Sequence, residues 1–139
     1  MKEGFTIIEQ LKLPSDFNAL VDVENLVDRV CNGLGVHEDA YGNVLVAVTE
    51  AVNNAIQHGN RLDPSKIIEM EAEAEGNSIQ FKISDQGKGF DFSNIPDPTE
   101  PQNLEKPNGR GVFLMKNLAD AVSFEENGRI VHLKFNAIN

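Results

Sequence analysis

The spacing of apolar side chains over residues 43–60 is helical, and the rest of the chain can be interpreted around this stretch. At about 100° per residue, its apolar positions fall within one arc of roughly 140° that would face a core. These positions are Val44, Leu45, Val48, Ala51, Val52, Ala55 and Ile56. Glu50, Asn54 and His58 follow one another at four-residue spacing on another arc, so we expect them to be neighbours on the helix surface. The pattern predicts a helix from about His37 to Gln57 with a core side and a polar side.

The preceding residues predict a strand and another helix. Phe5–Leu13 has the apolar pattern of a short strand. Ser15 or Asp16 can cap the N-terminus of the helix that follows, and Gly35 can terminate it. The apolar stripe of this helix consists of Phe17, Leu20, Val21, Val27, Val30, Cys31 and Leu34.

After the turn at residues 62–65 the period of the pattern changes to two. Ile68, Met70, Ala72 and Ala74 alternate with Glu69, Glu71, Glu73 and Glu75. Such alternation predicts an antiparallel strand with one core face and one solvated face. Gly76-Asn77 predicts a tight turn into a second strand, whose core face consists of Ile79, Phe81 and Ile83.

Asp85–Asn108 breaks this regular pattern and predicts a long loop. We expect its Phe90–Asn108 segment to be a lid over a functional site. A third helix is predicted from Gly109, followed by strands over Ala121–Glu125 and Arg129–Ala137. The element order is therefore β-α-α-β-β-loop-α-β-β. This order predicts an α+β fold of two layers, with a largely antiparallel sheet and all helices on one face.

Composition and charge narrow the function classes. The chain has 139 residues, which fits a single domain over 1–139, and a formal net charge of −10. This charge argues against nucleic-acid binding; it fits a basic protein partner or an acidic surface with no partner. No apolar run approaches the ~18 residues of a membrane span, and the first residues do not resemble a signal peptide. The single cysteine, Cys31, suits a reducing cytoplasm and, on an apolar stripe, is expected to be buried and unreactive.

Three stretches carry groups that fit a nucleotide. Asp85 follows a strand and can accept a hydrogen bond from an exocyclic amine such as adenine N6, while Gly87 and Gly89 allow close approach to a flat ring. The segment 108–111 precedes the third helix, whose free N–H groups attract phosphate. The amide oxygen of Asn54 can ligate Mg²⁺, and Glu50 is placed to act on a nucleophile near the γ-phosphate.

Each of these features also has a simpler interpretation. A polar helix side is usually solvated, a glycine pair usually forms a turn, and Gly-Arg-Gly before a helix is often a plain cap. The chain has no Walker-type motif, and its histidines lack zinc spacing. His58 at the helix end is better suited to hydrogen bonding than to metal ligation. It is the combination of the three stretches that indicates a nucleotide site.

At these residues the chain resembles a known family. Glu50–Gly59 is similar to the N box of the GHKL ATPases, Asp85–Phe90 to their first glycine box and Gly109–Met115 to the second. The short chain most resembles the bacterial anti-sigma factor serine/threonine kinases, over about residues 9–135. The resemblance implies the Bergerat ATP-binding fold, ATP and Mg²⁺ as cofactors, and phosphorylation of a serine on an anti-anti-sigma (antagonist) partner that controls a sigma factor.

The resemblance also implies roles for individual residues. Asp85 would bind the adenine amine, Asn54 the magnesium ion, and Glu50 would orient or deprotonate the serine hydroxyl. The other residues implied in nucleotide binding are His58, Gly87, Gly89, Phe90, Gly109, Gly111 and Val112. Lys106 or Arg110 is the candidate for the γ-phosphate contact, since Pro107-Asn108 stands where relatives often carry a basic residue. Gly128-Arg129 stands where relatives often have Gly-Thr, so no nucleotide contact is assigned there.

Two other functions remain open from the sequence. The first is an ATP-binding module that sequesters a partner without phosphotransfer, and Glu50 argues against it. The second is a detached catalytic domain of a histidine kinase. The resemblance also allows a homodimer.

Overall fold

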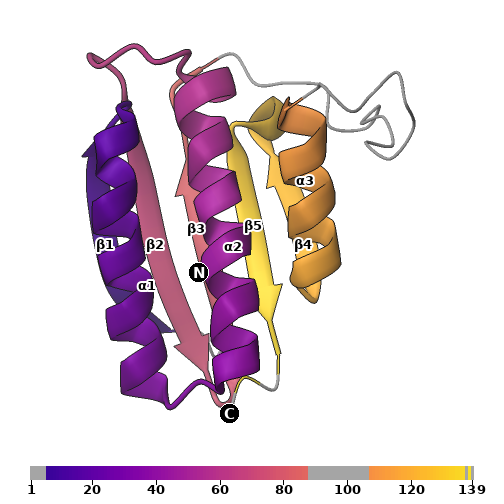
Figure 1. Cartoon of the computed structure of the whole chain (residues 1–139). Coiled ribbons are helices and arrows are strands. Elements are labelled where there is room, and N and C mark those ends of the chain that lie inside the picture. The colour runs from indigo at the N-terminus through magenta and orange to yellow at the C-terminus, as the bar shows by residue number, and fades with distance from the viewer. Residues whose placement is uncertain (1–5, 88–106, 137, 139) are drawn as a thin grey trace.

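The strands of the chain form one layer and the helices another (Figure 1). The computed structural model describes residues 6–87, 107–136 and 138, without the side chains of 107–112 and 127. The strands are β1 (Thr6–Pro14), β2 (Ile67–Glu75), β3 (Ser78–Ser84), β4 (Ala121–Glu125) and β5 (Ile130–Phe135). They make one sheet in the order β1-β2-β3-β5-β4, in which every described pairing is antiparallel. The helices are α1 (Leu20–Leu34), α2 (Glu38–Asn54) and α3 (Pro107–Leu118). The predicted two-layer α+β fold with helices on one face is confirmed.

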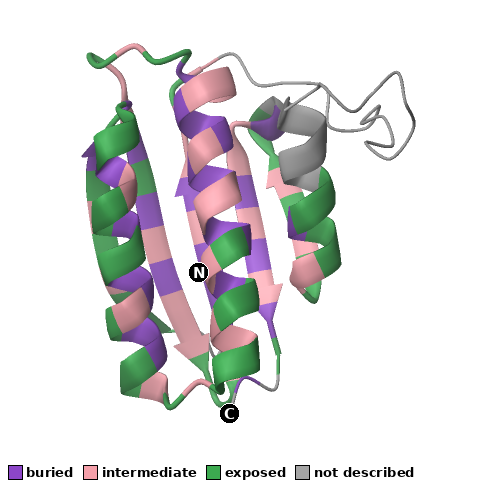
Figure 2. Cartoon of the chain, viewed as in Figure 1, coloured by how far each residue is buried: buried purple, intermediate pink, exposed green. Residues whose placement is uncertain are grey.

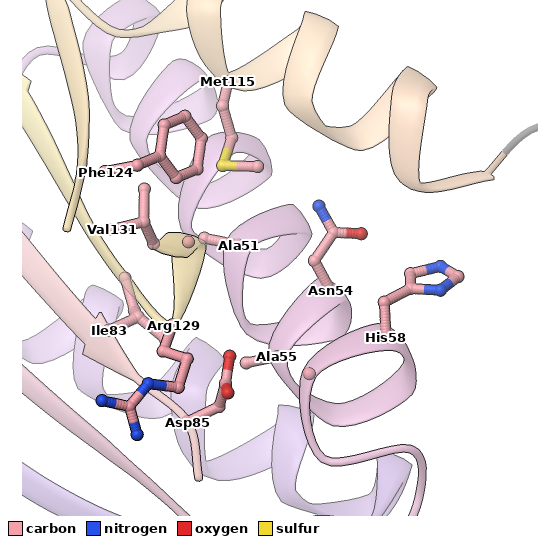
Figure 3. A pocket seen from close by; sticks show the side chains of 12 residues that line it. Ala51, Asn54, Ala55, His58, Ile83, Asp85, Met115, Phe124, Arg129 and Val131 are labelled. Carbon is pink, nitrogen blue, oxygen red and sulfur yellow. The ribbon is translucent and has the colours of Figure 1, made fainter. Parts of the chain in front are cut away.

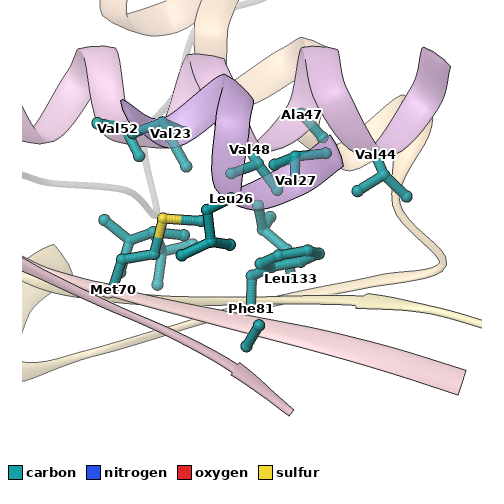
Figure 4. Close-up of a cluster of buried hydrophobic side chains, with 14 of the residues drawn as sticks. Val23, Leu26, Val27, Val44, Ala47, Val48, Val52, Met70, Phe81 and Leu133 are labelled. Carbon is teal, nitrogen blue, oxygen red and sulfur yellow. The ribbon is translucent and has the colours of Figure 1, made fainter. Parts of the chain in front are cut away.

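The core lies between the α1–α2 pair and the inner face of the sheet (Figures 2 and 4). Its central side chains, each at most 1% exposed, are Val23, Leu26, Val27, Val44, Ala47, Val48, Val52, Met70, Phe81 and Leu133. Phe81 also meets Phe135 edge to face, with ring centroids 6.3 Å apart. The stripe predicted for α2 is confirmed, with six of its positions buried and Leu45 packed against the core at its margin. This packing fixes which side of α2 is left for the site.

The start of α1 differs from the prediction. Asp16 caps a 3₁₀ turn, Phe17–Ala19, by accepting a hydrogen bond from the Asn18 N–H, and α1 follows that turn. Phe17 and Val21 are 45% and 59% exposed, so their assignment to the core stripe was wrong. Val21 lies about 200° from Val23 around the helix and therefore points to solvent. Gly35 terminates α1 as predicted, with a φ of 66°.

The outer face of the sheet is polar, as the alternation predicted. Glu69 and Glu75 are exposed, and Glu71 and Glu73 are half-buried. Lys82 of β3 stands opposite Glu71 in the register, where the charges attract. The turn between β2 and β3 has Gly76 at a φ of 57°, which a residue with a side chain rarely adopts.

The connection from β3 to β5 brings the site elements together. The chain leaves β3, forms α3 and the edge strand β4, and returns as β5 between β3 and β4. The end of α2, the start of α3 and the end of β3 consequently lie at the same end of the molecule (Figure 1). α3 begins at Pro107, a residue favoured at the first helical position, so segment 108–111 lies within the helix and not before it as predicted. Among the described residues, no helix is long and apolar enough to cross a membrane.

Candidate functional site

The polar side of α2 leads into the site. After Asn54 the helix continues as one π-helical turn, Ala55–Gly59, which carries His58. Asn54 is only 9% exposed, so the prediction that it lies on the surface was wrong. The reason is that α3 packs against this side of α2. Within the described part of the chain, Asn54 Nδ2 and His58 Nε2 are buried without a hydrogen-bond partner, and burial lowers the pKa of His58, which favours its neutral form.

A pocket opens beside these two side chains, between α2, α3 and the sheet (Figure 3). It holds about 410 Å³ of empty space, part of which is open to solvent. The residues lining it are Ala51, Asn54, Ala55, His58, Gly59, Ile83, Asp85, Met115, Phe124, Gly128, Arg129 and Val131. An apolar wall with a few polar groups is typical of a site for a small organic molecule.

Asp85 is the acidic residue of the pocket, one residue beyond the end of β3. Its N–H donates to the Arg129 carbonyl at 2.9 Å, and its Oδ1 accepts from the Gly87 N–H at 2.8 Å. Burial raises the pKa of Asp85, while the Gly87 N–H bond and the charges of Arg129 and Lys66 act in the opposite direction. The carboxylate is thus a hydrogen-bond acceptor held at the pocket wall.

Two glycines allow the end of α2 to approach Asp85. A Cβ atom on Gly59 would lie 2.3 Å from Asp85 Oδ2, and one on Gly87 would lie 1.9 Å from the Gly59 carbonyl oxygen. Both distances are too short for a side chain, so the contact requires glycine on both segments. The sequence placed Gly59 in the N box and Gly87 in the first glycine box, but only the fold shows that they touch.

The structure brings together some of the predicted site residues. Asn54, His58 and Asp85 line the pocket, and Gly87 lies against Gly59. Glu50 is half-buried one turn before Asn54 and is not among the described residues that line the pocket. Gly109, Arg110, Gly111 and Val112 belong to the first turns of α3, and their side chains are outside the description. Gly89, Phe90, Lys106 and the expected lid up to residue 106 lie outside the described residues. The last two lid positions, 107 and 108, belong to α3.

Other pocket residues were not predicted. Met115 and Val131 are buried and, with Phe124, supply apolar wall. Arg129 lines the pocket beside Asp85 and forms a 3.0 Å ion pair with Glu126. In the sequence, Met115 ends the second glycine box and Arg129 follows Gly128. Neither position indicates a pocket, because both residues reach it only through the packing of α3 and the return of β5.

Comparison with known proteins identifies the family. The sequence profile of the family described as "Histidine kinase-like ATPase domain" matches residues 13–135. The chain belongs to this family. Its N box and glycine boxes fall within the matched range, so the predicted GHKL resemblance is confirmed.

Relatives of the chain are serine-protein kinases by name. "Serine-protein kinase RsbW" from Bacillus cereus (strain AH820) is 28% identical over 128 residues, which cover 88% of this chain and 79% of the relative. The protein of that name from Bacillus thuringiensis (strain Al Hakam) gives the same values. A crystal structure of the RsbU and RsbW domains of Rv1364c from Mycobacterium tuberculosis matches the fold with a TM-score of 0.61 at 15% identity. That match covers 93% of this chain and 32% of the other.

The family implies ATP, and the residues of the pocket fit a nucleotide with its metal ion. Asp85 supplies a hydrogen-bond acceptor, and Gly59 contributes wall that has no side chain of its own. Asn54 Nδ2 and His58 Nε2 are buried with no partner among the described residues and can donate to phosphate oxygens. The group of Asn54 that can ligate Mg²⁺ is its amide oxygen. The described residues contain no group of three or more His, Cys, Asp or Glu side chains that could hold a metal ion. Mg²⁺ commonly takes few protein oxygens and completes its shell with phosphates and waters.

Proposed function

We propose that the protein is an ATP-dependent serine/threonine kinase of the anti-sigma type. It phosphorylates an anti-anti-sigma partner and thereby controls the availability of a sigma factor. The observation that carries this proposal is the pocket in which Asp85 lies against the end of α2 beside Asn54 and His58. The kinase names of the relatives support the reaction type.

In this proposal Asp85 selects the base. Its carboxylate accepts a hydrogen bond from the adenine 6-amino group, while the apolar wall of the pocket, with Met115 and Phe124, covers the ring. A guanine would present an oxygen at the same place, and two acceptors would then face each other. Adenine nucleotides should therefore bind more tightly than guanine nucleotides.

The part of the site away from Asp85 binds the phosphates. Asn54 holds the magnesium ion through its amide oxygen, and His58, which burial keeps neutral, can donate a hydrogen bond from its ring. The first N–H groups of α3 face no partner within the helix and favour an anion. Bound Mg²⁺ neutralises charge on the phosphate oxygens.

The transfer step requires positioning and one base. The serine Oγ of the partner attacks the γ-phosphorus, the bond from phosphorus to the β-γ bridging oxygen breaks, and the products are phosphoserine and ADP. Glu50 accepts the hydroxyl proton. It lies one helical turn from Asn54, on the same side of α2. Glu50 acts on the hydroxyl proton and Asn54 on the metal ion, so the loss of Glu50 and the loss of Asn54 should have different kinetic effects.

The test compares two variants on a purified anti-anti-sigma partner. Glu50→Gln preserves shape but removes the proton acceptor, so phosphotransfer should fall by about 10²–10⁴ while ATP affinity changes little. Asn54→Ala should weaken Mg·ATP binding as well as turnover. Phosphate transfer is measured with labelled ATP and affinity by calorimetry.

A matched control is Glu69→Gln, the same substitution on the exposed outer face of β2. It should keep wild-type phosphotransfer. The second candidate function is an ATP-binding module that sequesters a partner without phosphotransfer. The observation in favour of this function is that Glu50 is not among the described residues that line the pocket. That function would replace the kinase if Glu50→Gln transferred phosphate at the wild-type rate, or if the wild type transferred none.

A further inference from the structure

A buried asparagine, Asn60, connects several segments next to the pocket. It is 1% exposed and follows directly after Gly59. Its Nδ2 donates to Ser15 Oγ at 2.7 Å and to the Ile67 carbonyl at 3.1 Å. Its Oδ1 accepts from the Gln86 N–H at 2.7 Å. One carboxamide thus joins the chain after β1, the start of β2 and the loop after β3.

The loop after β3 is held from a second side by the Gln86 side chain. Its Oε1 accepts from the Ile67 N–H at 2.8 Å. With the bond from its own N–H to Asn60, residue 86 is tied through both main chain and side chain. Its neighbours are Asp85 and Gly87, which are bonded to each other through the carboxylate. The position of Gln86 therefore determines where the Asp85 carboxylate points.

Asn60 also determines the other side of the contact with Asp85. Its N–H donates to the Ala55 carbonyl at 2.8 Å and closes the π-helical turn that ends at Gly59. Gly59 in turn lies against the Asp85 carboxylate. The main chain of Asn60 thus places the end of α2, and its side chain places the loop that carries Asp85.

We propose that Asn60 is a positioning residue for base recognition, which holds the Asp85 carboxylate at the distance from α2 that the adenine amine requires. The inference rests on the proposed role of Asp85 toward the base. An asparagine suits the position because the site needs both a donor and an acceptor. Alanine would leave the part-buried Gln86 N–H and Ile67 carbonyl without this partner, and a shift of the loop would relieve that cost.

The test uses a ligand pair that differs only at the recognised group. Purine riboside triphosphate is ATP without the 6-amino group, so the ratio of the two affinities reports the bond to Asp85. The wild type should prefer ATP by roughly tenfold or more, as expected for a hydrogen bond to a charged group. Asn60→Ala should reduce this preference to about threefold or less, mainly by weakening ATP.

The control for lost stability is Val27→Ala, which opens the core at a residue that does not line the pocket. It should keep the wild-type preference, with affinities measured by calorimetry at a temperature where circular dichroism shows each variant folded. If Asn60→Ala does not fold, Asn60→Ser makes the same comparison, because its hydroxyl is one bond closer to the main chain and leaves the Gln86 N–H without its acceptor.

The outcomes separate this inference from the proposed function. A wild type without preference for ATP would contradict base recognition by Asp85 itself. A wild type that prefers ATP, with an Asn60 variant that prefers it equally, would overturn only the positioning role. If Val27→Ala also lost the preference for ATP, the effect of the Asn60 variant would be due to reduced stability, and the positioning role would be overturned as well.

Discussion

Gly59→Ala should disrupt the site while leaving the fold intact. The added Cβ would lie 2.3 Å from Asp85 Oδ2, 2.5 Å from its Cγ and 2.9 Å from Oδ1. All three atoms belong to one carboxylate at the end of a side chain, so the clash can be relieved by moving that group. None of these three nearest atoms belongs to the main chain, so the cost to folding should be small.

The size of the effect follows from the displacement. Ordinary contact begins near 3.4 Å, so the Asp85 carboxylate must move by about 1 Å or more. Such a shift takes it away from the Gly87 N–H that now orients it. Under the proposed function it also takes the carboxylate away from the adenine amine. Loss of a hydrogen bond to a charged group costs about 1.5–3 kcal/mol, which corresponds to roughly 10- to 150-fold weaker ATP binding.

The matched control is Gly42→Ala in α2, where a Cβ would meet no atom within 4 Å. This variant should gain about 0.4–1 kcal/mol in the free energy of unfolding, because alanine restricts the unfolded chain more than glycine does. Calorimetry with ATP and thermal unfolding of both variants make the comparison. Wild-type ATP affinity in a folded Gly59→Ala protein would refute the reasoning that glycine is needed for the Asp85 contact.

Two further predictions concern titratable side chains. Asp85→Asn should lose most of the preference for ATP over GTP in calorimetry. It should also raise the melting temperature of the nucleotide-free protein at pH 7. Burial raises the pKa of Asp85, so ionisation of the carboxyl group destabilises the folded state once the pH rises above that pKa, whereas asparagine does not ionise. An unchanged or lower melting temperature would count against this. Cys31 is 4% exposed and burial raises its pKa to about 11, so it should react with a thiol reagent at pH 8 only after unfolding. Rapid reaction of the folded protein would show that the thiol is accessible.

Several features of the fold could be predicted because they depend on local periodicity. In β2 the side-chain direction depends only on whether a position is odd or even, so the run from Ile68 to Glu75 determines both faces of the strand. In α2 the stripe from Val44 to Ile56 determines the buried side in the same way. The turn at Gly76 follows from its main-chain freedom alone.

The errors arose where a neighbour distant in sequence decides the environment. Phe17 lies in a 3₁₀ turn and not in the regular helix, so its place on a helical wheel was misleading. Asn54 lies on the predicted polar side of α2, yet α3 covers that side and buries it. Spacing within one helix carries no information about what packs against its far side.

The amino-acid sequence by itself determined the chemistry available to the site, including Asp85 after a strand and Asn54 on the helix that ends in His58. Only the tertiary structure decided which of these groups meet. Gly59 touches Asp85, and Asn60 binds Gln86 across 26 residues of chain, because α2 ends beside the end of β3 in the same two-layer packing. Such contacts depend on strand order and on how helices cover the sheet. These properties belong to the whole chain, so no local pattern encodes them.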